Sequence, residues 1–113
     1  MDTSLTNQSA VVWLDRTHAL VARAHEGRAA VTEVDRSFDG EPAYLLRVLH
    51  EAADCDRIVV MGTDAARVAL EREYVALYRR PDRLVDVGQM GEPRQADLVE
   101  HLRLLEPSLA ATH

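Results

Sequence analysis

Residues 57–64 read Arg-Ile-Val-Val-Met-Gly-Thr-Asp. The apolar run from Ile58 to Met61 has the length of a strand and carries no polar residue, which is typical of a strand buried on both faces. Gly62 and Thr63 end this run, and threonine is one of the residues preferred at a helix N-cap. The stretch therefore predicts an interior strand that leads directly into a helix.

Three strand-like segments precede this stretch, at residues 11–14, 19–24 and 29–34. Each is rich in strand-forming residues or alternates between two faces. Short turn signals separate them, at residues 15–17 and 26–28, and Gly27 in the second turn can adopt a positive φ. We therefore expect an antiparallel meander of three strands.

Helices and strands alternate in the rest of the chain. Pro42 fits the first position of a helix whose apolar residues recur at helical spacing. After the meander the predicted elements are a helix over 42–53, a strand over 57–61, a helix over 64–78, a strand over 84–87 and a helix that ends before Pro107. In the 64–78 helix, the residues expected to pack inward are Val68, Ala69, Tyr74, Val75 and Leu77. The order β-β-β-α-β-α-β-α predicts an α/β fold with a mixed five-stranded sheet and helices on its faces.

The length of 113 residues fits one domain. We expect an N-terminal tail over 1–9, a single α/β domain over 10–107 and a C-terminal tail over 108–113. Cys55 is the only cysteine, which fits a reducing compartment. Because the sequence has neither a signal-peptide pattern nor an apolar run of membrane length, we expect a cytoplasmic protein without membrane contact.

The net charge of −6 disfavours nonspecific nucleic-acid binding by the whole surface, because phosphate contacts need clustered cations. All cations are arginines, and Arg79 and Arg80 lie close to Tyr74 and Tyr78. Aromatic rings and guanidinium groups can stack on RNA bases, so this group is a candidate RNA contact. The alternative is a solvated, arginine-rich turn.

Three segments carry a resemblance to a known family: residues 11–19, residues 58–64 and residues 84–87 with the glycine-containing loop that follows. They resemble the middle domain of the archaeo-eukaryotic peptide-chain release factors and its bacterial relatives. The resemblance implies a ribonuclease-H-like fold of the translational-machinery-component type. It also implies the ribosome or a protein as partner.

The catalytic loop of that family has no counterpart at the corresponding place. In release factors a Gly-Gly-Gln loop between the third strand and the following helix hydrolyses peptidyl-tRNA. Here residues 36–41 read Arg-Ser-Phe-Asp-Gly-Glu, and Gly88-Gln89 follows the fifth strand without the first glycine. The resemblance thus implies a non-enzymatic binding module with no catalytic residue, metal or cofactor.

Asp15 and Asp64 support an alternative, a divalent-metal-dependent nuclease of the ribonuclease-H-like type. Such enzymes use clustered carboxylates to hold two Mg²⁺ ions, and Glu41 or Glu51 could supply a third ligand. The competing interpretation is that Asp15 starts a hairpin turn and Asp64 lies in the first turn of a helix, where the helix dipole favours negative charge.

Thr63 begins a helix whose free N–H groups could bind an anion, although a plain N-cap role is the competing interpretation. The five histidines lack zinc-like spacing and are expected to be scattered surface residues. Cys55 lies between two aspartates, which disfavour a reactive thiolate. The candidate binding residues are Asp15, Thr63, Asp64, Arg79 and Arg80.

A third hypothesis is a homo-oligomeric structural or regulatory protein. The segment 29–34 could form the edge of the sheet, and Ala29-Ala30-Val31 carries no charge to prevent pairing with another strand. A homodimer is the simplest form of this hypothesis.

Overall fold

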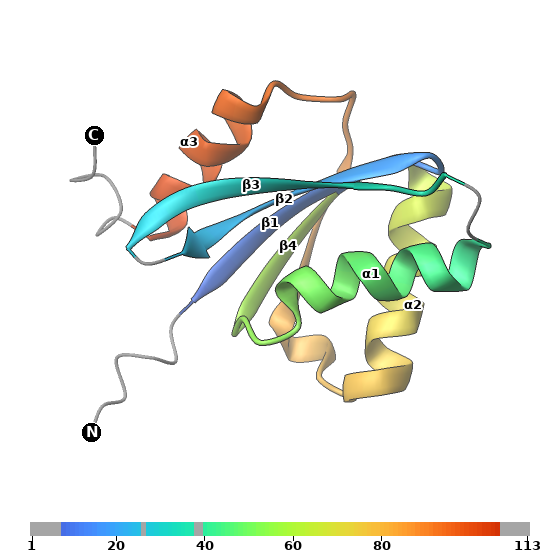
Figure 1. Ribbon diagram of the computed structural model, residues 1–113. Helices are drawn as coiled ribbons and strands as arrows, with labels where there is room; N and C mark the ends of the chain where they lie inside the picture. The colour runs from blue at the N-terminus through green and yellow to red at the C-terminus, as the bar shows by residue number, and fades with distance from the viewer. Residues whose placement is uncertain (1–7, 26, 38–39, 107–113) are drawn as a thin grey trace.

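Five strands form one mixed sheet in the computed structural model, which describes residues 8–25, 27–37 and 40–106. The elements are β1 (Ser9–Leu14), β2 (His18–His25), β3 (Arg28–Asp35), α1 (Glu41–Ala52), β4 (Arg57–Gly62), α2 (Asp64–Tyr78), the short 3₁₀ helix η2 (Pro81–Arg83), β5 (Leu84–Gln89) and α3 (Gln95–Leu105). The strands lie in the order β3-β2-β1-β4-β5 (Figure 1). The predicted order of elements is confirmed. Apart from residues 8 and 9, the predicted tails lie outside the described residues.

β1 is the middle strand, and all six of its residues are buried. It pairs antiparallel with β2 and parallel with β4, so that Trp13 lies between Leu20 and Met61. Side chains alternate between the faces of a strand, so one strand contributes to the packing on both sides of the sheet.

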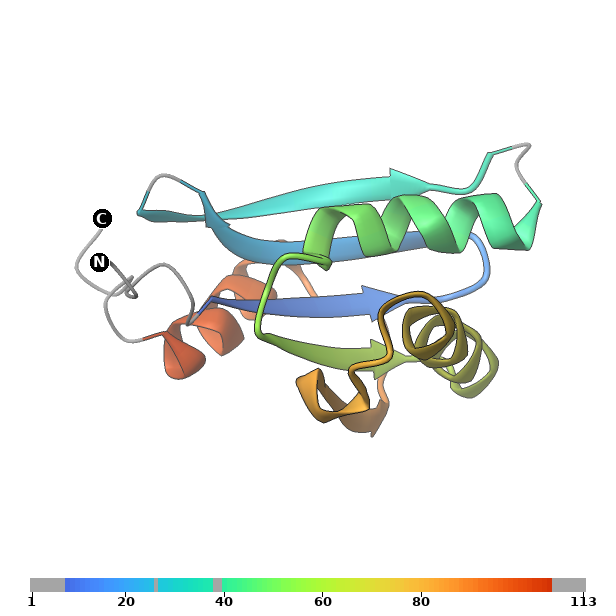
Figure 2. The ribbon, with the colours of Figure 1, turned by 90° about the horizontal axis from the view of Figure 1, so that it is seen from below.

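Two hydrophobic cores form on the two faces. The larger core packs α1 and α2 against the face that carries Val12 and Leu14. The smaller one packs α3 against the face that carries Val11 and Trp13. Figure 2 shows α1 running along the β2–β3 part of the sheet, with α2 beside it toward β4. No helix of the described residues is long and apolar enough to cross a membrane.

The inward face of α2 differs from the predicted one. Val68 and Leu77 are 44% and 50% exposed, whereas Ala66, Leu70 and Tyr74 are buried. The three buried residues are spaced four apart and therefore form a single stripe along the helix. The prediction was wrong for Val68 and Leu77 because α2 lies at the side of the sheet and buries only a narrow stripe.

Gly62 fixes the distance between the ends of β4 and β1. A Cβ atom added at this position would lie 2.0 Å from the carbonyl oxygen of Leu14, and the φ of Gly62 is +135°. The next residue donates a hydrogen bond from the Thr63 N–H to the same oxygen at 3.1 Å. Only glycine satisfies both the contact and the backbone conformation at this site.

Gly62→Ala should therefore destabilise the fold by about 3 kcal/mol or more, because the alanine is strained and collides with β1. Gly91→Ala is the matched control, since nothing lies within 4 Å of a Cβ atom built there. Urea denaturation followed by circular dichroism measures both. Equal stability of the two variants would contradict the proposed packing constraint.

Candidate functional site

The carboxyl ends of the parallel strands β1, β4 and β5 meet at one edge of the sheet. In open α/β sheets, ligands bind outside this edge. The β1–β2 turn and the start of α2 both lie here, because Leu14 pairs with Gly62. The structure therefore brings Asp15, Thr63 and Asp64 to the same edge, as required for a shared site.

Asp15 organises the β1–β2 turn. Its Oδ1 atom accepts hydrogen bonds from the Thr17 N–H and hydroxyl, both at 2.8 Å, and from the His18 N–H at 2.9 Å. Burial acts to raise the pKa of Asp15, but the backbone hydrogen bonds from Thr17 and His18 outweigh it, so the pKa lies below its ordinary value. Asp15 thus acts as the carboxylate that closes the hairpin turn.

Asp64 uses its carboxylate in a different contact. The Arg67 guanidinium donates to both Asp64 and Asp86, and so links the start of α2 to β5. Within the described part of the chain, no three histidine, cysteine, aspartate or glutamate side chains are grouped so that they could hold a metal ion. Asp15 and Asp64 thus each serve a local structural contact.

Thr63 occupies the N-cap position of α2, but its side chain does not cap the helix. The hydroxyl oxygen is buried without a hydrogen-bond partner among the described residues. The backbone instead holds the position: the Arg67 N–H donates to the Thr63 carbonyl at 2.9 Å. Thr63 is therefore the N-cap residue that the sequence predicts, although its hydroxyl does not make the capping hydrogen bond.

Arg79 and Arg80 lie at the opposite end of α2. Arg79 caps this helix in a left-handed conformation, with φ of 56°. Arg80 donates two hydrogen bonds to Asp82, at 3.0 and 2.9 Å, which offset its charge. Tyr74 is fully buried and stacks on Tyr78 at 5.0 Å between ring centroids, so only Tyr78 is exposed for stacking. The predicted basic and aromatic group is therefore smaller than the sequence suggested.

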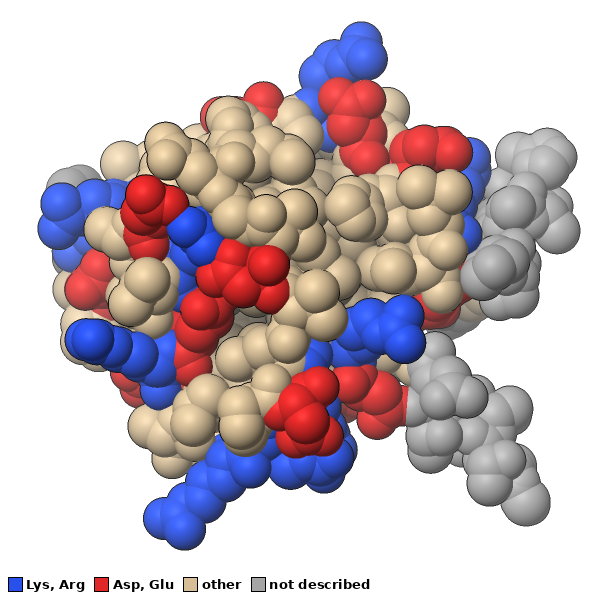
Figure 3. Space-filling view, turned by 180° about the vertical axis from the view of Figure 1, so that it is seen from behind, with Lys and Arg blue, Asp and Glu red and all other residues tan. Residues whose placement is uncertain are grey.

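Figure 3 shows the face opposite to that of Figure 1. Basic and acidic side chains are interspersed on it around a broad uncharged area. A nucleic-acid-binding face normally gathers its cations into one patch. On the face shown, the cations are not gathered in this way.

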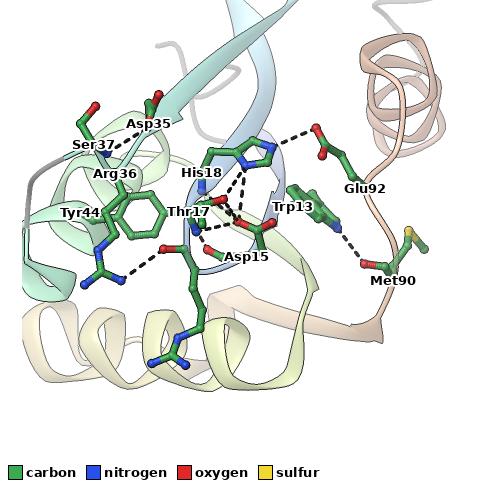
Figure 4. A network of polar contacts seen from close by, with 11 residues as sticks. Trp13, Asp15, Thr17, His18, Asp35, Arg36, Ser37, Tyr44, Met90 and Glu92 are labelled. Atoms are coloured by element: carbon green, nitrogen blue, oxygen red, sulfur yellow. Dashed lines mark hydrogen bonds and ion pairs between the residues drawn. The ribbon is translucent and has the colours of Figure 1, made fainter.

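His18 forms a polar connection that the sequence did not reveal. Its Nε2 atom lies 2.9 Å from Glu92 Oε2, and its Nδ1 atom lies 3.1 Å from the Thr17 hydroxyl (Figure 4). The imidazole also contacts the Trp13 ring at 5.3 Å between centroids, and Trp13 donates from Nε1 to the Met90 carbonyl at 2.8 Å. These contacts, which we call the His18 tie, join the β1–β2 turn to the loop between β5 and α3.

The His18 tie is sensitive to protonation. The hydrogen bond to Glu92 and the nearby charge of Asp15 raise the pKa of His18, whereas partial burial acts in the opposite direction. His18 thus departs from the scattered surface histidine that the sequence predicts. No local signal could have identified it, because Glu92 lies 74 positions away in the chain.

A pocket of about 400 Å³ lies beside this turn. Its lining combines two arginines and two hydroxyl residues with one aspartate: Arg16, Thr17, Asp35, Arg36 and Ser37. This composition favours an anionic group over a cation. The Tyr44 hydroxyl also contacts the β1–β2 turn, because it donates a hydrogen bond to the Asp15 carbonyl at 2.9 Å. Burial raises the pKa of Tyr44.

Glu71 and Asp86 form a second titratable pair, beside Arg67. Burial and the neighbouring Asp86 carboxyl raise the pKa of Glu71 to about 7. The hydrogen bond with Glu71 lowers the pKa of Asp86, and the charge of Arg67 adds to this effect. Glu71 therefore holds the proton of the pair, and Asp86 stays ionised against Arg67.

The His18 tie predicts a pH-dependent stability. Since the folded-state pKa of His18 lies above its ordinary value, the tie stabilises the fold below about pH 6.5 and is lost as pH rises through the folded-state value. Between about pH 5 and about pH 8, the wild-type protein should lose about 0.5 kcal/mol more stability than Glu92→Gln, a small difference because Glu92 is exposed. Urea midpoints at both pH values measure this difference, and equal losses would contradict it.

The Glu71–Asp86 pair predicts an effect at alkaline pH. An acid whose folded-state pKa is raised stabilises the fold at low pH and loses that contribution as pH rises through about 7. Glu71→Gln keeps a hydrogen-bond donor and has no proton to lose, so it should be more stable than wild type by about 1 kcal/mol at about pH 8.5. The gain should shrink toward about pH 4.5. Thermal unfolding at the two pH values provides the measurement, and a gain that does not depend on pH would rule out this explanation.

Comparisons with known proteins relate the chain through its fold. No family model and no curated protein matches its sequence. Among solved structures, Pelota of Archaeoglobus fulgidus is similar over 93% of this chain, with a TM-score of 0.66 and 12% sequence identity. Pelota of Thermoplasma acidophilum is similar over 96% of this chain, with a TM-score of 0.56 and 17% identity. The chain spans 34% and 39% of those two proteins. It has a ribonuclease-H-like fold.

Proposed function

We propose that the chain is a non-enzymatic binding module related to the middle domain of release-factor-like proteins, and that it associates with the translation machinery. The observation that carries this proposal is its similarity in fold to Pelota, a release-factor-like protein, over 93% of the chain. The resemblance of residues 11–19 and 58–64 to the release-factor middle domain supports it independently. Because the chain spans about a third of Pelota, the proposal concerns the role of one domain.

The site at the carboxyl edge of the sheet supports binding better than hydrolysis. Asp15 is engaged by its own turn, and Asp64 is engaged by Arg67. The β3–α1 connection, at residues 36–40, has no Gly-Gly-Gln sequence. Its residues 38 and 39 lie outside the described part of the chain.

Arg79 and Arg80 are the surface cations that we propose for contact with the partner, because both are exposed at the end of α2. Phosphate contacts made by arginines release counterions, so a complex held by them weakens as salt increases. Such contacts can act locally even though the net charge of the chain is −6.

Sedimentation of the tagged protein through sucrose gradients tests this proposal. We expect the wild-type protein to move with ribosomes at low salt. The double variant Arg79→Glu with Arg80→Glu should shift about tenfold toward the free fraction. Arg94→Glu is the matched control, because Arg94 is 85% exposed at the start of α3, on the opposite face of the sheet.

Protein that stays in the free fraction at every salt concentration would overturn the ribosomal part of the proposal. Release of peptide from peptidyl-tRNA by the purified protein would overturn the non-enzymatic part. If the wild-type protein sediments with ribosomes and the double variant does so to the same extent, the contact lies on another surface.

A further inference from the structure

The pocket of about 400 Å³ beside the β1–β2 turn has walls from two segments that hydrogen bonds hold together. Arg16 and Thr17 come from the turn, and Asp35, Arg36 and Ser37 come from the place where β3 ends. The Arg36 N–H donates to the Thr17 carbonyl at 2.9 Å, and Arg36 Nη1 donates to the Arg16 carbonyl at 3.2 Å (Figure 4). The two walls therefore keep a fixed spacing.

Three side chains give the pocket hydrogen-bond donors. Arg16 and Arg36 carry guanidinium groups, and Ser37 carries a hydroxyl group. Each guanidinium has five N–H donors in a planar fork, so Arg36 can donate to a ligand while it keeps its contacts with the protein. Ser37 has a φ of 52°, in the left-handed region that residues other than glycine adopt rarely. Its N–H donates to Asp35 Oδ1 at 2.9 Å, which fixes this turn.

Two other side chains give the same pocket hydrogen-bond acceptors. The Thr17 hydroxyl donates to Asp15 Oδ1 at 2.8 Å, so its oxygen offers a lone pair to a ligand. The Asp35 carboxylate has more acceptor sites than the one that the Ser37 N–H occupies. Donors and acceptors in one pocket suit a ligand that carries both an anionic group and hydroxyl groups.

The charges of the lining favour a phosphate as that anionic group. Two arginines face one aspartate in the lining, and the adjacent Asp15 carboxylate is engaged by the N–H groups of its own turn. A phosphate monoester carries about two negative charges at neutral pH and three acceptor oxygens, which match two guanidinium forks and a hydroxyl. A carboxylate has one charge and two oxygens, so it uses fewer of these donors.

We propose that this pocket binds a sugar phosphate, in which Arg16, Arg36 and Ser37 hold the phosphate monoester while Thr17 and Asp35 accept hydrogen bonds from the sugar hydroxyls. The volume is in the range of small-molecule sites and exceeds what a phosphate alone fills. The pocket lies at the β1–β2 turn, whereas the proposed ribosomal contact at Arg79 and Arg80 lies at the opposite end of α2. The inference therefore goes beyond the proposed function and does not rest on it.

The sugar phosphate has two possible sources that share this chemistry. One is a free phosphorylated sugar, and the other is the phosphorylated 5′ end of an RNA. No aromatic residue lines the pocket, so it offers no surface on which a nucleobase would stack. The ribose with its terminal phosphate is thus the recognised unit in both cases.

Isothermal titration calorimetry of the full chain with ribose 5-phosphate tests the proposal. Ribose and glutamate serve as probes without phosphate. We expect ribose 5-phosphate to bind with a Kd below about 1 mM, and the other two probes to bind at least about tenfold more weakly. Because the second ionisation of a phosphate monoester has a pKa of about 6, the affinity should rise several-fold between about pH 5 and about pH 7.5.

Substitutions of the arginines test the assigned residues. Arg16→Gln removes one guanidinium from the exposed turn and should weaken binding at least about tenfold. Arg36→Lys keeps the charge but loses the planar fork, so it should also weaken binding. Arg28→Gln is the matched control, because Arg28 is exposed at the other end of β3. Circular dichroism confirms that the variants are folded.

Short RNAs distinguish the two sources. Fluorescence anisotropy compares one sequence with a 5′-phosphate and with a 5′-hydroxyl group. If the phosphorylated RNA binds at least about tenfold more tightly than ribose 5-phosphate, the pocket receives an RNA end. If the two bind equally, the pocket receives a free sugar phosphate.

Four outcomes would overturn the inference. They are the absence of binding by both phosphorylated probes, glutamate that binds as tightly as ribose 5-phosphate, wild-type affinity in both Arg16→Gln and Arg36→Lys, and RNA that binds equally with and without its 5′-phosphate. None of these measurements uses ribosomes, so failure of the pocket leaves the translation proposal standing.

Discussion

Burial of β1 on both faces is the constraint on which the other elements depend. The strand is paired on both sides and buried along its whole length, so it contributes side chains to both hydrophobic cores. Its even-numbered residues anchor α1 and α2, and its odd-numbered residues anchor α3. The close contact of Gly62 with Leu14 then sets how near β4 lies to β1, and thereby where α2 begins.

The same arrangement explains why the carboxyl edge of the sheet is rich in polar contacts. Three chain segments arrive there with unpaired backbone groups, and buried polar groups need partners. Asp15 satisfies the N–H groups of the β1–β2 turn, Tyr44 reaches the Asp15 carbonyl, and Trp13 reaches the Met90 carbonyl. Much of the chemistry at this edge therefore stabilises the fold, and the open surfaces lie beside it.

The sequence predicted the order of the elements because apolar runs and turn residues are local signals. Residues 57–61 are buried as their continuous hydrophobicity indicated, apart from Arg57 at the strand start, and the helix over 64–78 has the predicted bounds. The inward face of α2 was not predictable, since the exposure of Val68 depends on where the sheet ends. The pairing of His18 with Glu92 was not predictable either, because it joins segments that are distant in the sequence and that only the fold brings together.

The His18 tie also gives the molecule an intrinsic optical probe. Trp13 is the only tryptophan, it is 2% exposed, and its ring contacts the His18 imidazole. A protonated imidazole quenches indole emission by accepting an electron from the excited ring. The fluorescence intensity of the unlabelled protein thus depends on whether the His18 imidazole is protonated. It also depends on whether the loop after β5 keeps its contact with Trp13 through the Met90 carbonyl.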